Sequence, residues 1–136
     1  MTSITSSKAQ ETLAHGIQYI QAQNYKDVCL SVCDAQGFLI AFVRMEKAPL
    51  RSIEIAQRKA YTSVRLGSTT EVFHQKLQQA GFEISYYGDP RLTAMAGGAC
   101  ITGPQGEPLG GVGVSGLLPQ EDQVVANELA RFAAGA

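Results

Sequence analysis

The sequence has 136 residues, of which 45% are hydrophobic and 17% charged, and its formal net charge is −1 at pH 7. This size and composition are typical of a globular protein with a single core, so we expect residues 1–136 to fold as one domain. The near-neutral charge excludes the basic surface that marks proteins binding nucleic acid or anionic membranes. Because no apolar run of about 18 residues and no signal-like start occurs, we expect a cytoplasmic location and no membrane partner.

One helix and two strands are expected in the first third of the chain. Ser7 followed by Gln10 forms a capping-box pattern, and apolar residues then recur at helical spacing up to Asn24. Two β-rich runs follow at 28–33 and 38–44, joined by a short turn rich in Asp and Gly. Both faces of the second run are apolar, which predicts that helices cover both faces or that a second subunit covers one.

Two consecutive helices are expected next. Pro49 is well placed at the start of a helix whose apolar stripe runs to Gly67, a suitable C-terminal cap. Ser68 and Glu71 form another capping-box pattern, and the apolar spacing that follows ends at Gly81. The pattern therefore predicts two helices separated by a short break.

The last third predicts a loop, a second hairpin and a final helix. Residues 82–98 show neither helical nor strand periodicity, and long loops in compact domains often carry function. Residues 99–102 and 108–115 read as two strands, and Pro119 opens a helix whose first turn is acidic. The order α-β-β-α-α-β-β-α with two hairpins predicts an α+β fold, an antiparallel sheet flanked by helices.

The segment 110–116 contains the pattern G-x-G-x-x-G in Gly111, Gly113 and Gly116. A dinucleotide site needs this pattern inside a βαβ unit, with a carboxylate at the end of a second strand about 20 residues later. The 20 residues after Gly116 suffice for one helix and leave no second strand, so a nucleotide site is excluded. The glycines instead predict a strand that either a packed helix or a flat ligand approaches closely.

The cysteines Cys29, Cys33 and Cys100 are odd in number, so no disulfide framework is expected in an intracellular chain. Four residues along a strand span about 13 Å, which is too far for Cys29 to bond Cys33. We interpret the cysteines as small buried hydrophobic residues.

Four stretches together carry a resemblance to a known family. They are residues 32–37 leading to 41–45, residues 52–56 with 59–62, the pair Gly97-Gly98, and residues 110–116 with 120–122. In order and spacing they resemble the GlcG/HbpS-like family of haem-binding and glycolate-utilisation-operon proteins, which also occurs as the C-terminal domain of a corrinoid adenosyltransferase. The resemblance implies a profilin-like fold and homodimers or larger homo-oligomers such as octamers. It also implies a role in haem binding, haem degradation, iron sensing or corrinoid handling.

His15 is the candidate metal ligand. It lies about 200° around the expected first helix from Leu13, in a stripe with Tyr19 that points away from the main apolar face. The resemblance implies that a histidine on this helix is an axial ligand of haem iron, which makes haem the candidate cofactor, held at a subunit boundary. The alternative is a surface or interface histidine without a ligand. His74 has no visible carboxylate partner and is interpreted as part of a solvated helix face.

The expected second helix carries several charged candidates. Arg51, Arg58 and Arg65 repeat every seven residues, which is typical of a solvated face with ion pairs or of guanidinium groups that hold carboxylates. The resemblance implies a lysine at the position of Lys59 and an acidic residue at that of Glu54. Glu54 is interpreted as a general base, an iron ligand or an ion-pair partner.

Further candidates lie in the loop and the glycine-rich strand. Tyr87, which follows Tyr86 in the loop, offers a phenol that could donate a proton to a substrate or simply hold the loop. Gly98, Gly111 and Gly113 are candidate ligand-binding positions, because glycines can expose backbone N–H groups to an anion. Close packing of the strand on a helix explains them equally well. The acidic pair 121–122 is interpreted as complementing the helix dipole.

Three functions stay open. The first is a small-ligand-binding protein, for haem or another tetrapyrrole, with haem degradation as a further activity. The second is a cofactor-independent isomerase, hydratase or lyase that acts on a small organic acid, with Glu54, Lys59 and Tyr87 as catalytic residues and Arg51 as a ligand contact. The third is a regulatory partner domain that only oligomerises. The sequence favours the first narrowly.

Overall fold

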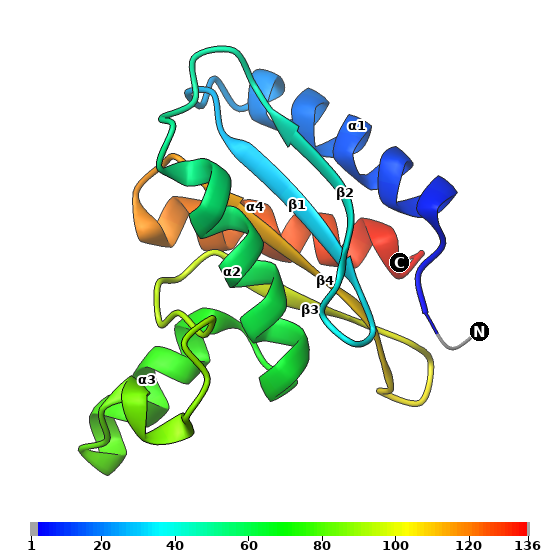
Figure 1. Cartoon of the computed structure of the whole chain (residues 1–136). Coiled ribbons are helices and arrows are strands. Elements are labelled where there is room, and N and C mark those ends of the chain that lie inside the picture. The colour runs from blue at the N-terminus through cyan, green and yellow to red at the C-terminus, as the bar shows by residue number, and fades with distance from the viewer. Residues whose placement is uncertain (1–2, 136) are drawn as a thin grey trace.

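A computed structural model describes residues 3–135 and contains the predicted elements in the predicted order (Figure 1). The fold class is confirmed: four helices flank one antiparallel sheet of four strands, an α+β arrangement. The helices are α1 (Ser6–Ala22), α2 (Ser52–Leu66), α3 (Thr70–Ala80) and α4 (Pro119–Ala133). The strands are β1 (Cys29–Asp34), β2 (Leu39–Arg44), β3 (Gly98–Thr102) and β4 (Pro108–Ser115), and a short 3-10 helix spans Ile84–Tyr87.

The sheet has the strand order β2-β1-β4-β3. Each hairpin supplies one central and one edge strand, and the two hairpins meet where β1 pairs with β4. In this pairing Cys29 lies opposite Ser115 and Asp34 lies opposite Gly110. Residues about 80 positions apart in the chain therefore form the centre of the sheet, so the core depends on long-range contacts.

The sheet separates two layers of helices. α1 and α4 lie on one side of it and α2 lies on the other (Figure 1). The main core lies between the strands and the α1–α4 layer, where Val32, Val112 and Leu129 are fully buried. Each such side chain contributes roughly 1.5–3 kcal/mol to folding. α3 adds a smaller cluster against α2, made by Tyr61, Phe73, Leu77 and Leu92.

Two helices begin at caps that the sequence patterns did not predict. Thr5 caps α1 and Thr69 caps α3, and each side chain accepts a hydrogen bond of 3.1 Å from the backbone N–H three residues later. The prediction that Ser7 and Ser68 cap these helices is therefore wrong. An N-cap needs extended backbone so that its side chain can reach back, and both threonines have it, with ψ of 158° and 154°.

α2 ends as predicted but begins later. Its C-cap Gly67 and the C-cap Gly81 of α3 both adopt the left-handed conformation, with φ of 64° and 66°, which glycine adopts without steric cost. The helix starts at Ser52 rather than at Pro49, because residues 49–51 form a turn in which the Ser52 N–H donates to the Pro49 carbonyl at 3.0 Å.

The helices of this chain do not cover both faces of the second strand, so of the two predicted alternatives only cover by a second subunit stays open. β2 is an edge strand, and α2 lies over β1, β4 and β3 instead. As a result Leu39 is 52% exposed and Phe38, just before the strand, is 61% exposed. Alternating apolar residues do not reveal whether a strand is central or at an edge, which tertiary packing decides.

The predicted loop over 82–98 is held against α2. The Arg58 Nη1 group donates to the Pro90 carbonyl at 2.7 Å, and the Thr93 N–H donates to Thr62 Oγ1 at 3.0 Å. The three cysteines are free thiols, and two of them, Cys29 and Cys33, are buried. Across residues 3–135, none of the helices is both long and apolar enough to span a membrane.

Candidate functional site

The glycine-rich strand β4 packs directly on the backbone of α2. A methyl group added to Gly111 would lie 2.6 Å from the Ala60 carbonyl oxygen, and one added to Gly113 would overlap the Ala56 carbonyl oxygen. Gly98, at the start of β3, meets the backbone of α2 in the same way. The close approach that the glycines predict is therefore that of a helix, and no room remains for a ligand beside these three positions.

A buried ion pair joins α2 to α4 behind this strand. Lys59 has no exposed surface, and its Nζ donates to Asp122 Oδ2 at 3.0 Å and to the Val114 carbonyl at 2.8 Å. Burial lowers the pKa of Lys59 and raises the pKa of Asp122, although each charge favours the other. Asp122 also accepts a hydrogen bond of 3.0 Å from the Leu117 N–H. Lys59 thus connects three elements and has no contact with solvent.

Gln123, which directly follows the last resembling stretch, and two serines within the stretches extend this network. The Gln123 side chain accepts from the Gly97 N–H at 2.8 Å and donates to the Gly98 carbonyl at 3.0 Å. On the α2 side, Ser115 Oγ donates to Ser52 Oγ at 3.1 Å. These buried polar groups satisfy one another. Several residues that carry the resemblance therefore hold α2, α4 and the sheet together.

His15 lies in the seam between α1 and α4. Its Nε2 is 2.7 Å from Glu128 Oε2, and its ring stacks on Phe132 with 4.1 Å between centroids and 6° between planes. Arg131 donates to both oxygens of Glu128, and chiefly through these bonds, with His15 assisting, the pKa of Glu128 falls to about 2. Because an ionised carboxylate can only accept, Nε2 carries the hydrogen that points to Glu128, and Nδ1 is not engaged by this contact.

The surroundings of His15 differ from those expected in one respect. The stripe of α1 that carries it does not point freely to solvent, since Thr12 is fully buried and Tyr19 is partly buried there. α4 packs beside α1 along this stripe (Figure 1). Phe132 of α4 lies in the same seam, half-buried against His15.

The predicted arginine row divides among different partners. Arg58 pairs with Glu54 at 3.0 Å, whereas Arg65 lies 5.0 Å from the centroid of the Tyr61 ring. Arg51 is exposed at the N-terminal end of α2. The row is thus a partly paired surface rather than one continuous cationic groove, as is usual for such spacing.

Tyr61 of α2 contacts two charged residues of the loop, Asp89 and Arg91. Its hydroxyl donates to Asp89 Oδ2 at 2.5 Å, and the Arg91 guanidinium lies 4.0 Å from its ring centroid. The shared hydrogen bond is the largest cause of the raised pKa of Tyr61 and of the lowered pKa of Asp89. The sequence patterns did not single out either residue, because the contact joins positions 28 apart on a helix and a loop.

The three predicted catalytic residues lie in separate environments. Lys59 is buried, while the side chain of Glu54 is 67% exposed on the outer face of α2. Tyr87 ends the 3-10 helix and packs edge-on against Phe73 of α3, with 5.2 Å between ring centroids. The structure does not bring these residues together in one cavity.

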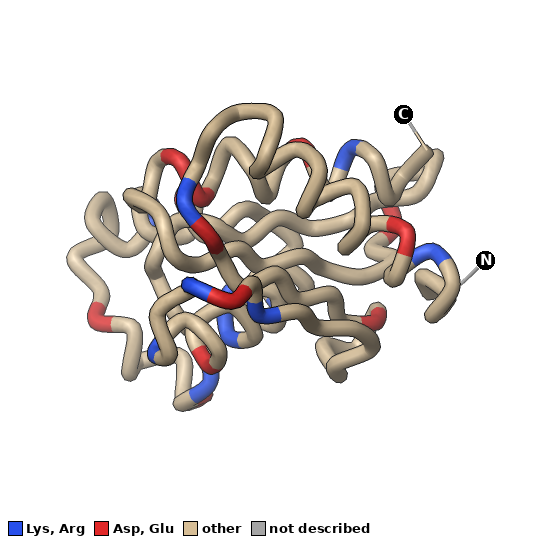
Figure 2. Tube along the Cα trace, turned by 90° about the horizontal axis from the view of Figure 1, so that it is seen from above, with Lys and Arg blue, Asp and Glu red and all other residues tan. Residues whose placement is uncertain are grey.

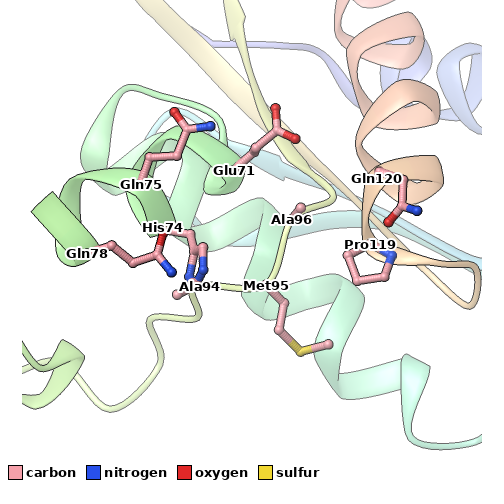
Figure 3. Close-up of a pocket in the computed structure, with 9 residues that line it drawn as sticks. All are labelled: Glu71, His74, Gln75, Gln78, Ala94, Met95, Ala96, Pro119 and Gln120. Atoms are coloured by element: carbon pink, nitrogen blue, oxygen red, sulfur yellow. The ribbon is translucent and has the colours of Figure 1, made fainter.

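A pocket of about 470 Å³ opens between α3, residues 94–96 and the start of α4. Figure 3 shows His74 on its α3 wall and Met95 on the segment that leads to β3. Gln75, Gln78 and Gln120 add amide groups to the lining. His74 is exposed, as its interpretation as part of a solvated helix face predicts. The pocket itself has no sequence signal, because the segments that line it meet only in the folded chain.

Charged residues of both signs are interspersed along the trace (Figure 2). Within residues 3–135, no group of three or more His, Cys, Asp or Glu side chains is arranged to hold a metal ion.

Residues 4–131 match the family described as haem degrading protein HbpS-like. The chain belongs to this family. It is 26% identical to the Klebsiella pneumoniae protein ORFY, with a TM-score of 0.87 over 100% of this chain and 93% of that one. A double mutant of Streptomyces reticuli HbpS is also 26% identical, with a TM-score of 0.86 over 97% and 88% of the two chains. PduOC in complex with heme shares the fold at 24% identity, with a TM-score of 0.82 over 96% and 94%. No curated protein matched the chain.

The residues that identify this HbpS-like chain by sequence are not the partners of its candidate ligand His15. Three of the four stretches that carry the resemblance contribute residues to the buried contacts around Lys59 and Asp122. The carboxylate partner of His15 lies 113 residues away on α4. Such a pair has no signature in local spacing, so sequence reasoning missed Glu128 although it selected His15.

Proposed function

We propose that this chain binds haem or another tetrapyrrole in the seam between α1 and α4, with His15 as an axial ligand of the iron. The family description names haem, and PduOC, which has the same fold, was solved with heme. The observation that carries the proposal is the contact of 2.7 Å between His15 and Glu128.

A histidine that ligates a metal nearly always gives its other ring N–H to a carboxylate, a carbonyl or a water. Glu128 meets this requirement, because Arg131 keeps it ionised and in place. The stacked Phe132 ring holds the imidazole in one plane. With Nε2–H engaged, Nδ1 would face the iron, and the carboxylate would make it a stronger donor.

A cation of the seam and a second copy of the chain would complete the proposed site. Lys8, whose ammonium lies 4.7 Å from the centroid of Phe132, would pair with a propionate. A flat ring against His15 would leave one face open, and a second copy of the chain would cover it in a homo-oligomer. Bound haem would supply iron that activates dioxygen, which is the chemistry that haem degradation requires.

The alternative functions receive less support. An enzyme acting on a small acid through Glu54, Lys59 and Tyr87 needs these groups in one cavity, and they lie apart. A domain that only oligomerises would not need the His15–Glu128 pair, although the exposed start of β2 with Phe38 and Leu39 suits a contact between copies.

The chain contains two histidines, so each serves as the control for the other. Haemin is titrated into the wild type, His15→Ala and His74→Ala, and the Soret band is followed. We expect His15→Ala to weaken binding at least about tenfold, the loss of one strong ligand bond, and added imidazole to restore the wild-type spectrum. His74→Ala should behave as the wild type.

Two results would contradict the proposal. Binding of haemin to His15→Ala with unchanged spectrum and affinity would remove His15 as the ligand. Loss of binding in His74→Ala alone would instead place haem in the pocket between α3 and α4. Circular dichroism of each variant shows that neither substitution has unfolded the chain.

A further inference from the structure

A small polar well lies beneath the turn between β1 and β2, on the side of the sheet that α2 covers. Its volume is about 10 Å³, which is room for one atom the size of a water oxygen. Its walls come from β1, the turn, β2, α2 and the 88–92 loop, through Ser31, Cys33, Gly37, Leu39, Gln57 and Arg91.

The well contains a polar group without a partner. Ser31 is 1% exposed, and its Oγ makes no hydrogen bond with any residue in the range 3–135. Buried hydroxyls are almost always hydrogen-bonded, because an unsatisfied one loses its water without compensation. Because this hydroxyl lies against a cavity of one-atom size, an oxygen atom placed in the cavity would satisfy it.

The charge around the well favours a negative occupant. Arg91 lies over the Tyr61 ring and takes part in none of the ion pairs formed within the described chain. Arg65 adds a second guanidinium over the same ring. Two carboxylates also lie nearby but do not line the well: Asp89 accepts from the Tyr61 hydroxyl and Asp34 from N–H groups of the turn. Burial raises the pKa of Cys33 to about 12, so its thiol is neutral and does not repel an anion.

We propose that this well binds the carboxylate group of a small organic acid. One carboxylate oxygen would enter the well and accept a hydrogen bond from Ser31 Oγ, and the other would meet the Arg91 guanidinium at the mouth. A planar carboxylate suits the fork of a guanidinium, and only one of its oxygens needs to fit the well. The rest of the acid would lie over the exposed side chain of Leu39.

The structure also supports the walls of this site. The loop that carries Arg91 is fixed to α2 by the Tyr61–Asp89 and Arg58–Pro90 hydrogen bonds. Gly37 has φ of 97° and packs on the Tyr61 ring. A side chain at this position would clash with that ring. The well is therefore formed by a turn and a loop that the same tyrosine positions.

This site is independent of the proposed haem site, because His15 lies in the α1–α4 layer on the opposite side of the sheet. Failure of haemin to bind says nothing about the well, and failure of a carboxylate to bind says nothing about the seam. His15→Ala is accordingly a control in which carboxylate binding should be unchanged.

The experiment is a titration followed by ¹⁵N–¹H NMR at constant ionic strength and pH 7, with sodium acetate as the probe. Acetamide, which has the same shape without the charge, is the matched control. We expect saturable shifts of the backbone amides of Ser31 and Gly37 and of the Arg91 Nε–H with acetate, and none with acetamide. Equal shifts with both, or no saturable shift with acetate, would overturn the proposal.

Substitutions then identify the contacts. Arg91→Gln should weaken acetate binding at least about tenfold and Ser31→Ala by a smaller factor, because Arg91 brings a positive charge to the carboxylate whereas Ser31 brings one neutral donor. Arg44→Gln removes an exposed arginine at the other end of β2 and should change nothing. If Arg91→Gln does not fold, Arg91→Lys replaces it, with an intermediate loss expected. Unchanged affinity in the folded Arg91 and Ser31 variants would overturn the assignment.

Thermal unfolding without a ligand gives a second readout. Ser31→Ala should leave Tm unchanged or raise it, since the lost hydroxyl has no partner. Ser115→Ala is the matched control on the neighbouring strand, and it should lower Tm because its hydroxyl is bonded to Ser52. A lower Tm for Ser31→Ala, equal to that of Ser115→Ala, would mean that the hydroxyl is satisfied within the protein and would overturn the need for an occupant.

Discussion

The two faces of the sheet are built on different principles. On the α2 face, glycines of β4 let the helix backbone approach the strand. A buried ion pair between Lys59 of α2 and Asp122 of α4 joins this helix to the opposite layer. On the α1–α4 face, apolar side chains such as Leu129 fill the space, and the polar pair of His15 and Glu128 lies near the surface. The first face contains residues that carry the resemblance to the family. The second contains the candidate iron ligand His15, whose partner Glu128 has no signal in the local sequence.

The comparison separates fold from function. The close contact between the backbones of β4 and α2 leaves no space for a Cβ atom, so it restricts these positions of the chain to glycine. A seam between two helices tolerates many side chains, so a ligand site there can change while the fold persists. Each of the following experiments would weaken or sharpen this distinction.

The largest effect is expected for Gly113→Ala. The added methyl group would overlap the Ala56 carbonyl, and neither the central strand nor the helix can move away without breaking other contacts. We expect a loss of about 5 kcal/mol or more, comparable with the whole stability of a domain, so that little folded protein remains. Urea unfolding followed by circular dichroism measures this loss.

Gly81→Ala is the matched control for this substitution. Gly81 has φ of 66° but open space around its Cβ position, so only the backbone cost of about 1–2 kcal/mol should appear. If Gly113→Ala lowers the free energy of unfolding no more than Gly81→Ala does, the close contact of β4 with α2 is not the reason for a glycine at position 113.

A smaller effect is expected for Lys59→Met. The substitution removes one member of a fully buried pair and leaves Asp122 without its counter-charge, which typically costs about 3–5 kcal/mol. The double variant Lys59→Met with Asp122→Leu removes both charges and should recover a large part of that loss. Chemical denaturation of the two variants checks the order, and a double variant less stable than the single one would contradict it.

The smallest effect concerns pH and the seam. The pKa of Glu128 is lowered to about 2, so its interactions stabilise the fold above the ordinary glutamate pKa and lose that contribution as the pH falls from about 4.5 to 2. Because Arg131 is half-exposed to solvent, we expect this contribution to be only about 1 kcal/mol.

Glu128→Gln tests this prediction. The variant should be less stable than the wild type at pH 7, and the difference should shrink towards pH 2, where the wild-type carboxyl is protonated. Thermal unfolding at pH 7, 4 and 2.5 measures it. A difference that is constant over this range would show that the glutamate acts through packing rather than through its charge.

Much of the fold could be predicted from the sequence because its signals are local. Gly67 and Gly81 end helices in the left-handed conformation that glycine favours, and Pro119 opens α4 as predicted. The N-terminal caps were harder to predict, since Thr5 and Ser7 are both suitable by type and only the backbone conformation distinguishes them.

The candidate site could be predicted only in part. His15 was selected from the resemblance and its helix position, but Glu128, 113 residues away, has no local relation to it. The well at Ser31 depends on a strand, a turn, a helix and a loop, and its defining feature is a missing hydrogen bond. No residue type or spacing encodes such an absence.

The sequence by itself determined the order of helices and strands, the α+β class, the family and the need for close backbone contact along β4, because each depends on periodicity, turn chemistry or residue size. The tertiary structure alone decided what makes that contact, since a glycine permits approach by a helix or by a ligand without choosing between them. It also decided which charges are buried in pairs and which face a cavity. Those outcomes depend on distances between segments that the chain brings together only when the core closes.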